Sequence, residues 1–192
     1  MLVGEGVKQM SKKSKIDIGN LSLKITKKDE LQLFKNKLQE AFAMAAIEKY
    51  GDEFKGFIPP DEAIQKSFDQ PGSVVYNILY NEMLIGGVIV IINEKTQHNS
   101  LEFFYISPQY HSLGLGLAAW EAIEAMYPDT QVWETATPYF EKRNINFYVN
   151  KCGFRIVEFY NKYHPDPNKD NSQNDESPHT KEEFFRFEKT MK

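Results

Sequence analysis

Residues 106–118, Ile-Ser-Pro-Gln-Tyr-His-Ser-Leu-Gly-Leu-Gly-Leu-Ala, have the composition of an anion-binding loop. An apolar run ends at Ser107, and Gly114 and Gly116 open a stretch whose apolar residues have helical spacing. The first N–H groups of a helix have no partner within the helix, and they lie at the positive end of its dipole. Glycines let a phosphate approach the main chain closely. Because residues 108–117 contain no acidic side chain, the segment predicts a phosphate-binding helix start.

Three interpretations of the two glycines are open. The simplest is that they allow close packing of a helix on a sheet, since G-x-G alone is a weak signal. The second is a dinucleotide fingerprint, because Gly114 to Ala119 match G-x-G-x-x-A and Glu134 follows at about the expected 20 residues. However, that fingerprint places its first glycine directly after the strand, whereas residues 108–113 intervene here. Too little chain follows to complete a doubly wound sheet.

The third interpretation is a resemblance to a known family. A strand, a proline, several residues and a Gly-x-Gly helix start resemble motif A of the GCN5-related N-acetyltransferases (GNAT), here His111-Ser-Leu-Gly114-Leu-Gly116. The next helix of that family ends similarly to A-I-x-F-Y-x-K-x-G-F, which reads NINFYVNKCGF at residues 144–154. The order of elements is similar from Leu21 to Lys192. The resemblance implies acetyl-CoA as co-substrate and direct acetyl transfer to an amine in a ternary complex.

The resemblance also implies where acetyl-CoA binds. In the family, motif A holds the pyrophosphate through main-chain N–H groups, and the preceding strand pairs with the pantetheine arm. The implied cofactor residues are Tyr105, Ile106, His111, Ser112, Leu113, Gly114, Leu115, Gly116 and Asn144. The sequence departs from the family pattern at His111, where Arg or Gln is usual, and at Ser112, where glycine is common. In the next helix, Glu141 and Asn144 replace the usual Asn and Ala.

Acetyl transfer from a thioester needs a neutral amine and a proton for the departing thiolate. Tyr148 is the candidate acid, because the family places a tyrosine near this point beside the CoA sulfur; the alternative is a core aromatic. One extra residue separates it from Gly153. Glu102 is the one charge within residues 101–106 and matches a strand position where many relatives carry a base-like Glu. It is a base acting through water or, alternatively, a solvent-facing residue. Glu134, on the neighbouring strand, is a second candidate carboxylate.

Apolar periodicity predicts the elements that position these residues. Strands are expected at 21–25, 74–80, 84–92, 101–106, 131–135, 154–160 and 184–190, with turns at 81–82 and 97–100. Helices are expected at 29–50, 61–69, 114–127 and 140–151, the first with a capping box formed by Asp29 and Gln32. The order indicates an α/β (α+β) fold. The resemblance implies a mixed, mostly antiparallel GNAT-like sheet of about six to seven strands, with helices on both faces.

Length and composition exclude several classes of protein. The chain has 192 residues, of which 41% are apolar, as expected for one domain, here residues 20–192. Residues 1–19 are expected to be a flexible tail, with Met10 as an alternative native start, because Gly4-Glu-Gly-Val can be encoded by a bacterial ribosome-binding sequence. Residues 164–182 are polar and are expected to form a mobile loop. No apolar run approaches the roughly 20 residues of a membrane helix, and no secretory signal is visible.

The net charge and the cysteine content limit which ligands and which kinds of site this protein is expected to have. A net charge of −4 disfavours nucleic acid. The single cysteine, Cys152, excludes an internal disulfide and a cysteine-built zinc site, and we expect it to be a small buried residue rather than a nucleophile. A cytoplasmic, bacterial N-acetyltransferase without a metal is therefore the expectation. A non-catalytic GNAT-like domain that binds CoA or a protein is the alternative. The acceptor amine and a homodimer through an exposed strand are left open.

Overall fold

The computed structural model describes residues 18–50, 58–167 and 183–192. The expected N-terminal tail with Met10 and most of the expected loop at 164–182 lie outside these residues. Seven strands form one sheet in the order β1-β2-β3-β4-β5-β7-β6. All neighbouring strands are antiparallel except β4 and β5, which are parallel. The strands are β1 (Leu21–Ile25), β2 (Ser73–Tyr80), β3 (Met83–Ile91), β4 (His98–Ile106), β5 (Val132–Pro138), β6 (Arg155–Tyr160) and β7 (Phe184–Thr190).

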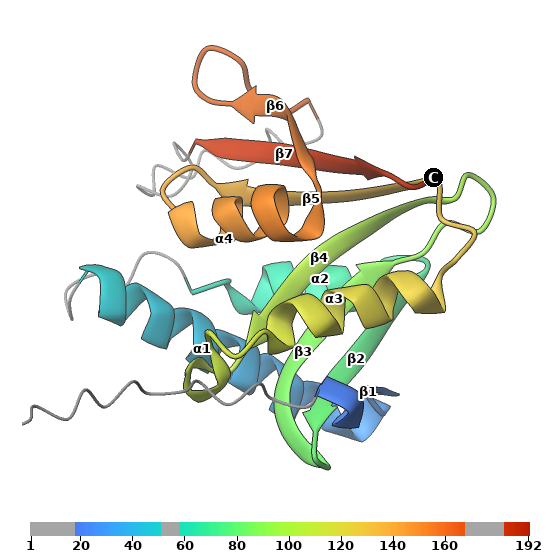
Figure 1. Cartoon of the computed structure of the whole chain (residues 1–192). Helices are drawn as coiled ribbons and strands as arrows, with labels where there is room; N and C mark the ends of the chain where they lie inside the picture. The colour runs from blue at the N-terminus through green and yellow to red at the C-terminus, as the bar shows by residue number, and fades with distance from the viewer. Residues whose placement is uncertain (1–17, 51–57, 168–182) are drawn as a thin grey trace, which may run out of the picture.

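Four α-helices cover the two faces of this sheet (Figure 1). Helices α1 (Leu31–Tyr50) and α2 (Asp61–Asp69) pack on one face, where Phe34, Leu38 and Ile64 form a buried cluster with strand residues. Helices α3 (Leu115–Met126) and α4 (Lys142–Phe147) lie on the other face, over a larger cluster around Trp120 and Trp133. The fold class expected from the sequence, a mixed and mostly antiparallel sheet between helices, is therefore confirmed.

The turns show where local sequence signals were sufficient and where they were not. The hairpin at Asn81-Glu82 is confirmed, and both residues have positive φ, at 49° and 67°, as in a type I′ turn. The expected turn at 97–100 is wrong, because β4 already begins at His98. Asn99 looks like a turn residue but is buried, and its Nδ2 donates to the Thr130 hydroxyl at 2.7 Å. A tertiary contact thus overrides local preference.

The start of α1 also differs from expectation. Residues 28–30 form a 3₁₀ turn before the α-helix begins at Leu31. The capping interaction joins the Lys27 N–H to the Glu30 carboxylate at 3.0 Å, whereas the expected box used Asp29 and Gln32. The side chain of Gln32 instead donates to Asn36 one turn further along the helix, at 2.9 Å. The helix itself is placed as the sequence predicts.

Candidate active site

Strands β4 and β5 part in the middle of the sheet. Their parallel ladder consists of four pairs and ends at Leu101↔Thr135, although β4 continues to Ile106 and β5 to Pro138. Both strands beyond that pair therefore have an edge that faces the other across a gap. The two strands thus splay apart from this last pair onward.

The β4 main chain presents polar groups to this gap at alternate residues. The Ser107 N–H donates to the Ile85 carbonyl at 2.8 Å, and Tyr105 pairs with Gly87 of β3. Because polar groups alternate along an antiparallel pair, Tyr105 turns its N–H and C=O towards β3, and Phe104 and Ile106 turn theirs towards the gap. Added-strand pairing with a ligand is thus available at Phe104 and at the Ile106 N–H, whereas the Ile106 carbonyl already accepts a hydrogen bond from His111. The sequence analysis named Tyr105 instead of Phe104, because the register of β3 with β4 decides which residues of β4 turn their main-chain polar groups towards the gap.

The loop between β4 and α3 contains two residues with a left-handed backbone conformation. Ser112 and Gly114 both have left-handed backbone conformations, with φ of 62° and 82°. Successive N–H groups in such a turn converge on one point, which favours anions. Gly114 is the residue before α3, and a methyl group there would meet no atom within 4 Å. Its role is therefore conformational, because its φ of 82° suits a glycine. The first hydrogen bond of the helix runs from the Ala118 N–H to the Gly114 carbonyl, at 3.1 Å.

The remaining residues of the loop have distinct positions. Leu113 and Ser112 are exposed, whereas Leu115 is buried and holds α3 on the sheet. The His111 ring Nε2–H donates to the Ile106 carbonyl at 2.6 Å, so this side chain ties the loop to the end of β4. A methyl group on Gly116 would lie 3.6 Å from the Phe147 ring, an ordinary contact. A methyl group therefore fits at Gly116, and close packing of α3, the simplest interpretation of the glycines, does not require a glycine at this position.

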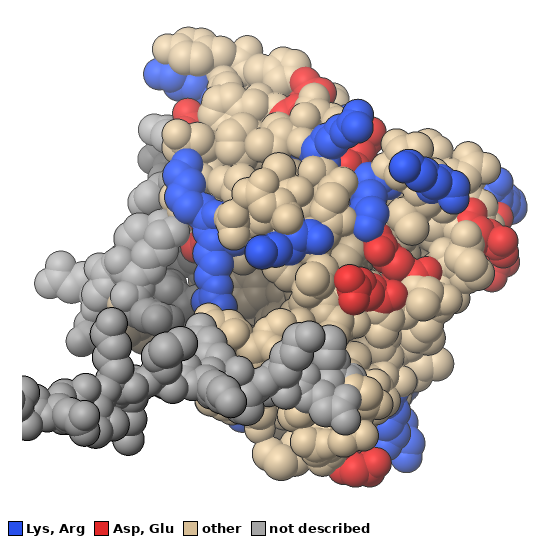
Figure 2. Space-filling model, viewed as in Figure 1, with Lys and Arg blue, Asp and Glu red and all other residues tan. Residues whose placement is uncertain are grey.

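Basic side chains gather beside the gap. Figure 2 shows Lys and Arg over α4, next to a hollow that opens between α4 and α3. The basic residues of α4 are Lys142 and Arg143, and Asn144 follows them in its first turn. Lys142 Nζ lies 3.3 Å from the centre of the Tyr139 ring. Positive charge at this position favours a phosphate-bearing ligand.

The helix that carries Tyr148 changes its winding there. The expected helix at 140–151 is an α-helix over Lys142–Phe147, followed by a π-helical turn over Tyr148–Cys152. The Gly153 and Phe154 N–H groups both donate to the Tyr148 carbonyl, and Gly153 has a φ of 82°. A π turn holds one residue more than the α-helix it replaces. The extra residue before Gly153 thus lies in a π turn that follows the α-helical part of the segment.

The phenol of Tyr148 lies beneath the end of the β4–β5 ladder. Its ring is 7% exposed and contacts Phe154 and Phe187 at centroid distances of 5.6 and 5.7 Å. Burial raises the pKa of Tyr148, and a hydrogen bond with Thr135 partly offsets this. Thr135 Oγ1 also donates to the Leu101 carbonyl at 2.9 Å. Tyr148 therefore holds its proton at neutral pH, beside the last strand pair. Sequence reasoning missed Thr135, because nothing local marks it.

Glu102 lies directly after that last pair. The register of β3 and β4 shifts here: Ile89 faces Phe103, and Val90 faces Leu101, so Glu102 has no partner on β3. The carboxylate is exposed and accepts a hydrogen bond from the Ser100 hydroxyl at 2.7 Å. The irregularity lies one residue beyond the last β4–β5 pair, so Glu102 stands on β4 where the gap begins. Its exposure agrees with a solvent-facing residue, one of the two alternatives for Glu102.

Glu134 is held by a cation. Arg186 Nη1 donates to Glu134 and to Glu188, each at 2.6 Å. Glu134 pairs with Ser100 across the ladder, so both candidate carboxylates lie near the same serine. Glu134 and Glu188 line a pocket of about 240 Å³ with His98 and Ser100. The difference between the two candidates is that Glu134 is neutralised by Arg186 and Glu102 is not.

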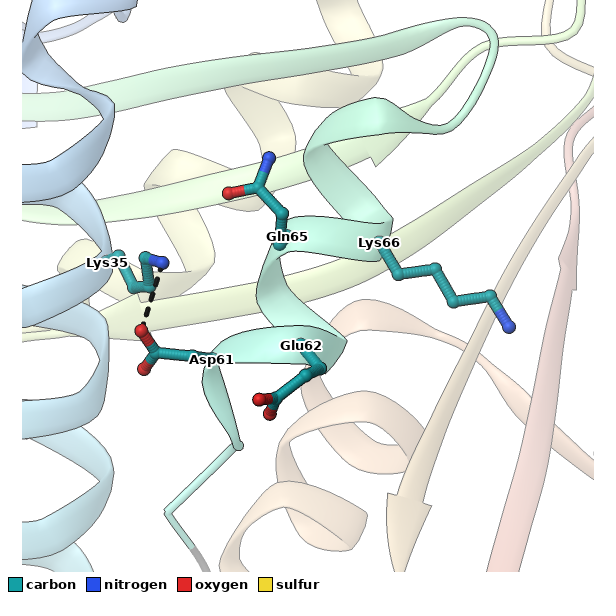
Figure 3. Close-up of a pocket in the computed structure, with 5 residues that line it drawn as sticks. All are labelled: Lys35, Asp61, Glu62, Gln65 and Lys66. Atoms are coloured by element: carbon teal, nitrogen blue, oxygen red, sulfur yellow. Dashed lines mark hydrogen bonds and ion pairs between the residues drawn. The ribbon is translucent and has the colours of Figure 1, made fainter. Parts of the chain in front are cut away.

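A larger pocket, of about 430 Å³, lies between α1 and α2 (Figure 3). It is lined by Lys35, Asp61, Glu62, Gln65 and Lys66. Lys35 Nζ lies 3.1 Å from Asp61, and hydrogen bonds from Gln39 and Lys35 lower the pKa of that carboxyl. Lys66 points away from this pair in Figure 3. These contacts fix the start of α2 on α1.

Other chemistries find little support in the described part of the chain. Cys152 is buried, and burial raises the pKa of its thiol to about 12, so it remains protonated. Among the described residues, no group of three His, Cys, Asp or Glu side chains is arranged to hold a metal ion. None of the described helices combines the length and apolar character needed to cross a bilayer.

Comparison with known proteins agrees with this geometry. The sequence model of the acetyltransferase (GNAT) family matches residues 36–154. The uncharacterized protein YrkN of Bacillus subtilis (strain 168) is 58% identical over 172 residues, which cover 88% of this chain and 93% of that protein.

Solved structures have the same fold. The ribosomal-protein-S18-alanine N-acetyltransferase of Escherichia coli superposes with a TM-score of 0.61 at 12% identity, covering 88% of this chain and 93% of that one. A Bacillus subtilis acetyltransferase in complex with CoA superposes with a TM-score of 0.58 at 17% identity, covering 90% and 99%. At these identities the likeness is one of fold.

Proposed function

The chain belongs to the acetyltransferase (GNAT) family, and from this premise we propose that it transfers the acetyl group of acetyl-CoA to an amine. Acetyl-CoA-dependent acetyl transfer is the general activity of the family. The observation that carries the proposal is the gap between β4 and β5, which begins at Leu101↔Thr135 and has a protonated tyrosine at its base. Transfer is direct, in a ternary complex, and no covalent enzyme intermediate forms.

The proposed cofactor site runs from the loop to the gap. Main-chain N–H groups of residues 111–116 bind the pyrophosphate, since Ser112 and Gly114 turn them outward at the start of α3. The main chain of Phe104 and Ile106 pairs with the amide groups of the pantetheine arm. Arg143 and Lys142 of α4 add positive charge beside the phosphates, which the gathering of basic side chains over α4 in Figure 2 supports.

The proposed chemistry uses two side chains. The amine nitrogen attacks the thioester carbonyl carbon, a C–N bond forms, and the C–S bond breaks with its electron pair going to sulfur. Tyr148 gives its phenol proton to that sulfur, so that CoA leaves as a thiol. Glu102 takes a proton from the amine through water, because its carboxylate is exposed at the mouth of the gap. The amine proton replaces the one that Tyr148 lost, and the enzyme is regenerated.

The acceptor is proposed to approach over the α1 and α2 side of β4 and β5. The pocket with Glu134 and Glu188 lies along this approach, one ladder pair before the gap. Carboxylates there favour an ammonium-bearing acceptor. This supports an amine over a neutral alcohol as the nucleophile. The Escherichia coli neighbour, a ribosomal-protein-S18-alanine N-acetyltransferase, also acetylates an amine.

The test has two stages. Thermal melting with acetyl-CoA, CoA, NAD and ATP should show stabilisation by the first two alone, of about 2.7 kcal/mol at 100 times Kd. Release of CoA thiol from acetyl-CoA is then followed with spermidine, a lysine peptide, an alanine-terminated peptide and kanamycin. Turnover with an amine confirms the proposal. Stabilisation by CoA without turnover of any amine favours the non-catalytic alternative, and stabilisation by NAD alone contradicts the family's cofactor here.

A further inference from the structure

The His111 side chain closes a short turn between β4 and the loop before α3. Its ring Nε2–H donates to the Ile106 carbonyl at 2.6 Å, five residues back along the chain. Ile106 is the last residue of β4 and is 8% exposed, so the bond ties the loop to the sheet. We propose that His111 is a positioning residue for acetyl-CoA, which holds the loop after it in the shape that binds the pyrophosphate. The inference rests on the proposed function, in which this loop takes the phosphates.

The turn that this bond spans, residues 106–111, has little freedom of its own. Residues 108–110 form a 3₁₀ turn that begins with a proline, whose ring fixes φ near −65°. The Tyr110 N–H donates to the Ser107 carbonyl at 2.9 Å. The His111 ring closes the turn from its far end, so the place and direction in which the chain leaves His111 are fixed as well.

Ser112, which follows directly, needs such a support. Its φ is 62°, in the left-handed region, which costs free energy for any residue with a Cβ atom. A residue other than glycine keeps this conformation only where its surroundings fix it. The Ser112 side chain is exposed, so packing around it does not supply the restraint, and the fixed His111 before it does. Gly114 differs, because a glycine adopts its φ of 82° without a restraint.

The conformation of Ser112 decides where the N–H groups of the loop point. Successive N–H groups around a left-handed residue converge on one point, and this geometry suits an anion. With a negative φ at Ser112 the neighbouring peptides would rotate, and their N–H groups would no longer converge. A site that already has its bound shape loses less conformational entropy when the ligand arrives. His111 therefore contributes to CoA affinity through the loop, and not through a contact of its own with a phosphate.

The binding test compares His111→Ala with His111→Gln by calorimetry with CoA. We expect His111→Ala to raise the Kd about tenfold, since it loses both the hydrogen bond and the loop shape that the bond fixes. His111→Gln should stay within about threefold of the native Kd, because its amide N–H can donate to the same carbonyl. With the fastest of the four named amines, His111→Ala should raise the KM for acetyl-CoA about tenfold and lower kcat by less than about threefold.

A double-mutant cycle separates positioning from a direct contact between His111 and a phosphate. In a Ser112→Gly background, His111→Ala should raise the Kd of CoA by less than about threefold, because glycine adopts a positive φ without the support. A loss of the same size in both backgrounds would overturn the positioning role and would indicate a direct contact. An unchanged Kd in His111→Ala alone would overturn the inference too.

The matched control is His164→Ala. It removes another histidine ring whose Nε2 lies 2.6 Å from its partner, here the Glu158 carboxylate of β6. We expect it to leave the Kd of CoA within about twofold. A rise equal to that in His111→Ala would overturn the inference, because it would show a general loss of structure.

Amide hydrogen exchange tests the loop without a ligand. Exchange within residues 107–117 should be at least about tenfold faster in His111→Ala than in the native protein, and unchanged in His164→Ala. Unchanged exchange in His111→Ala would overturn the inference. Failure of the proposed function gives a different result: a native protein that binds no CoA would overturn both. A native protein that binds CoA with these variant effects but turns over no amine would retain the positioning role and favour the non-catalytic alternative.

Discussion

Arg186 and Glu134 are joined by an ion pair of 2.6 Å between neighbouring strands β7 and β5. Arg186 binds Glu188 at the same distance, so one guanidinium is shared by two carboxylates next to the proposed acceptor approach, and one negative charge remains. Its side chain is 27% exposed, and its removal leaves two like charges close together.

Arg186→Met is therefore expected to destabilise the protein by about 1–2 kcal/mol at pH 7. Breaking a partly buried ion pair costs more stability than breaking one on the surface. The loss should diminish below about pH 4, where carboxylates become protonated. Urea unfolding at both pH values measures this. Arg143→Met, at an exposed position of α4, is the control and should change stability by less than about 0.5 kcal/mol. An undiminished loss at low pH would contradict the electrostatic explanation.

Glu102 and Glu134 are expected to differ in catalysis. Glu102→Gln should lower kcat/KM about 100-fold and remove the acid limb of its pH profile, because the exposed carboxylate relays the amine proton. Glu134→Gln should retain that limb, since Arg186 already neutralises Glu134. The pH dependence of kcat/KM with the best amine measures both. Loss of the acid limb in Glu134→Gln alone would exchange the two assignments.

Gly114 is expected to be essential for CoA binding. Gly114→Val places a β-branched residue at a φ of 82°, which costs about 1–2 kcal/mol or forces the loop to change shape. We expect the Kd of CoA, measured by calorimetry, to rise at least about tenfold. Ser112→Gly is the opposite case, because it relieves the left-handed conformation of Ser112. That variant should bind CoA at least as tightly, and weaker binding would assign a ligand contact to the Ser112 side chain.

Tyr148→Phe is expected to lower kcat by about 10²–10³-fold, the usual size of a lost general acid. The affinity for CoA should change little, because the ring remains in place. Tyr127→Phe is the matched control: it removes a hydroxyl that contacts the Tyr76 hydroxyl at 2.6 Å, away from the gap. It should cost stability without lowering kcat. Full activity of Tyr148→Phe would mean that another group protonates the thiolate.

Tyr105→Phe is expected to stabilise the protein, by about 0.5–1 kcal/mol at pH 7. The Tyr105 hydroxyl is buried and has no hydrogen-bond partner among the described residues. Burial, and the nearby charge of Glu40, raise the pKa of Tyr105. The folded state thus holds the proton more tightly, so this residue's contribution persists below pH 10 and falls as pH rises above it. The gain from Tyr105→Phe should grow between pH 9 and pH 11 in urea unfolding. A constant or negative gain would show that the hydroxyl has a partner.

The sequence determined the elements and their order through apolar periodicity, which acts over neighbouring residues. The strands at 21–25 and 184–190 and the hairpin turn at Asn81-Glu82 agree with the structure, because burial of one face and positive φ leave local marks. The glycine loop before α3 was also located from sequence, since its backbone conformation requires particular residue types. The polar residues 98–100 were assigned to a turn, because their partners on β5 are more than 30 residues away.

Only the tertiary structure decided how the candidate site is assembled. The register of β3 with β4 turns Phe104 to the gap and leaves Glu102 in a bulge. The pairing of β5 with β7 brings Arg186 to Glu134, across 52 residues of sequence. The π turn after Tyr148, and the packing of its ring against Phe187 of β7, likewise have no counterpart in a local pattern. These relationships depend on strand register and long-range packing, which a one-residue shift would change without altering any local pattern.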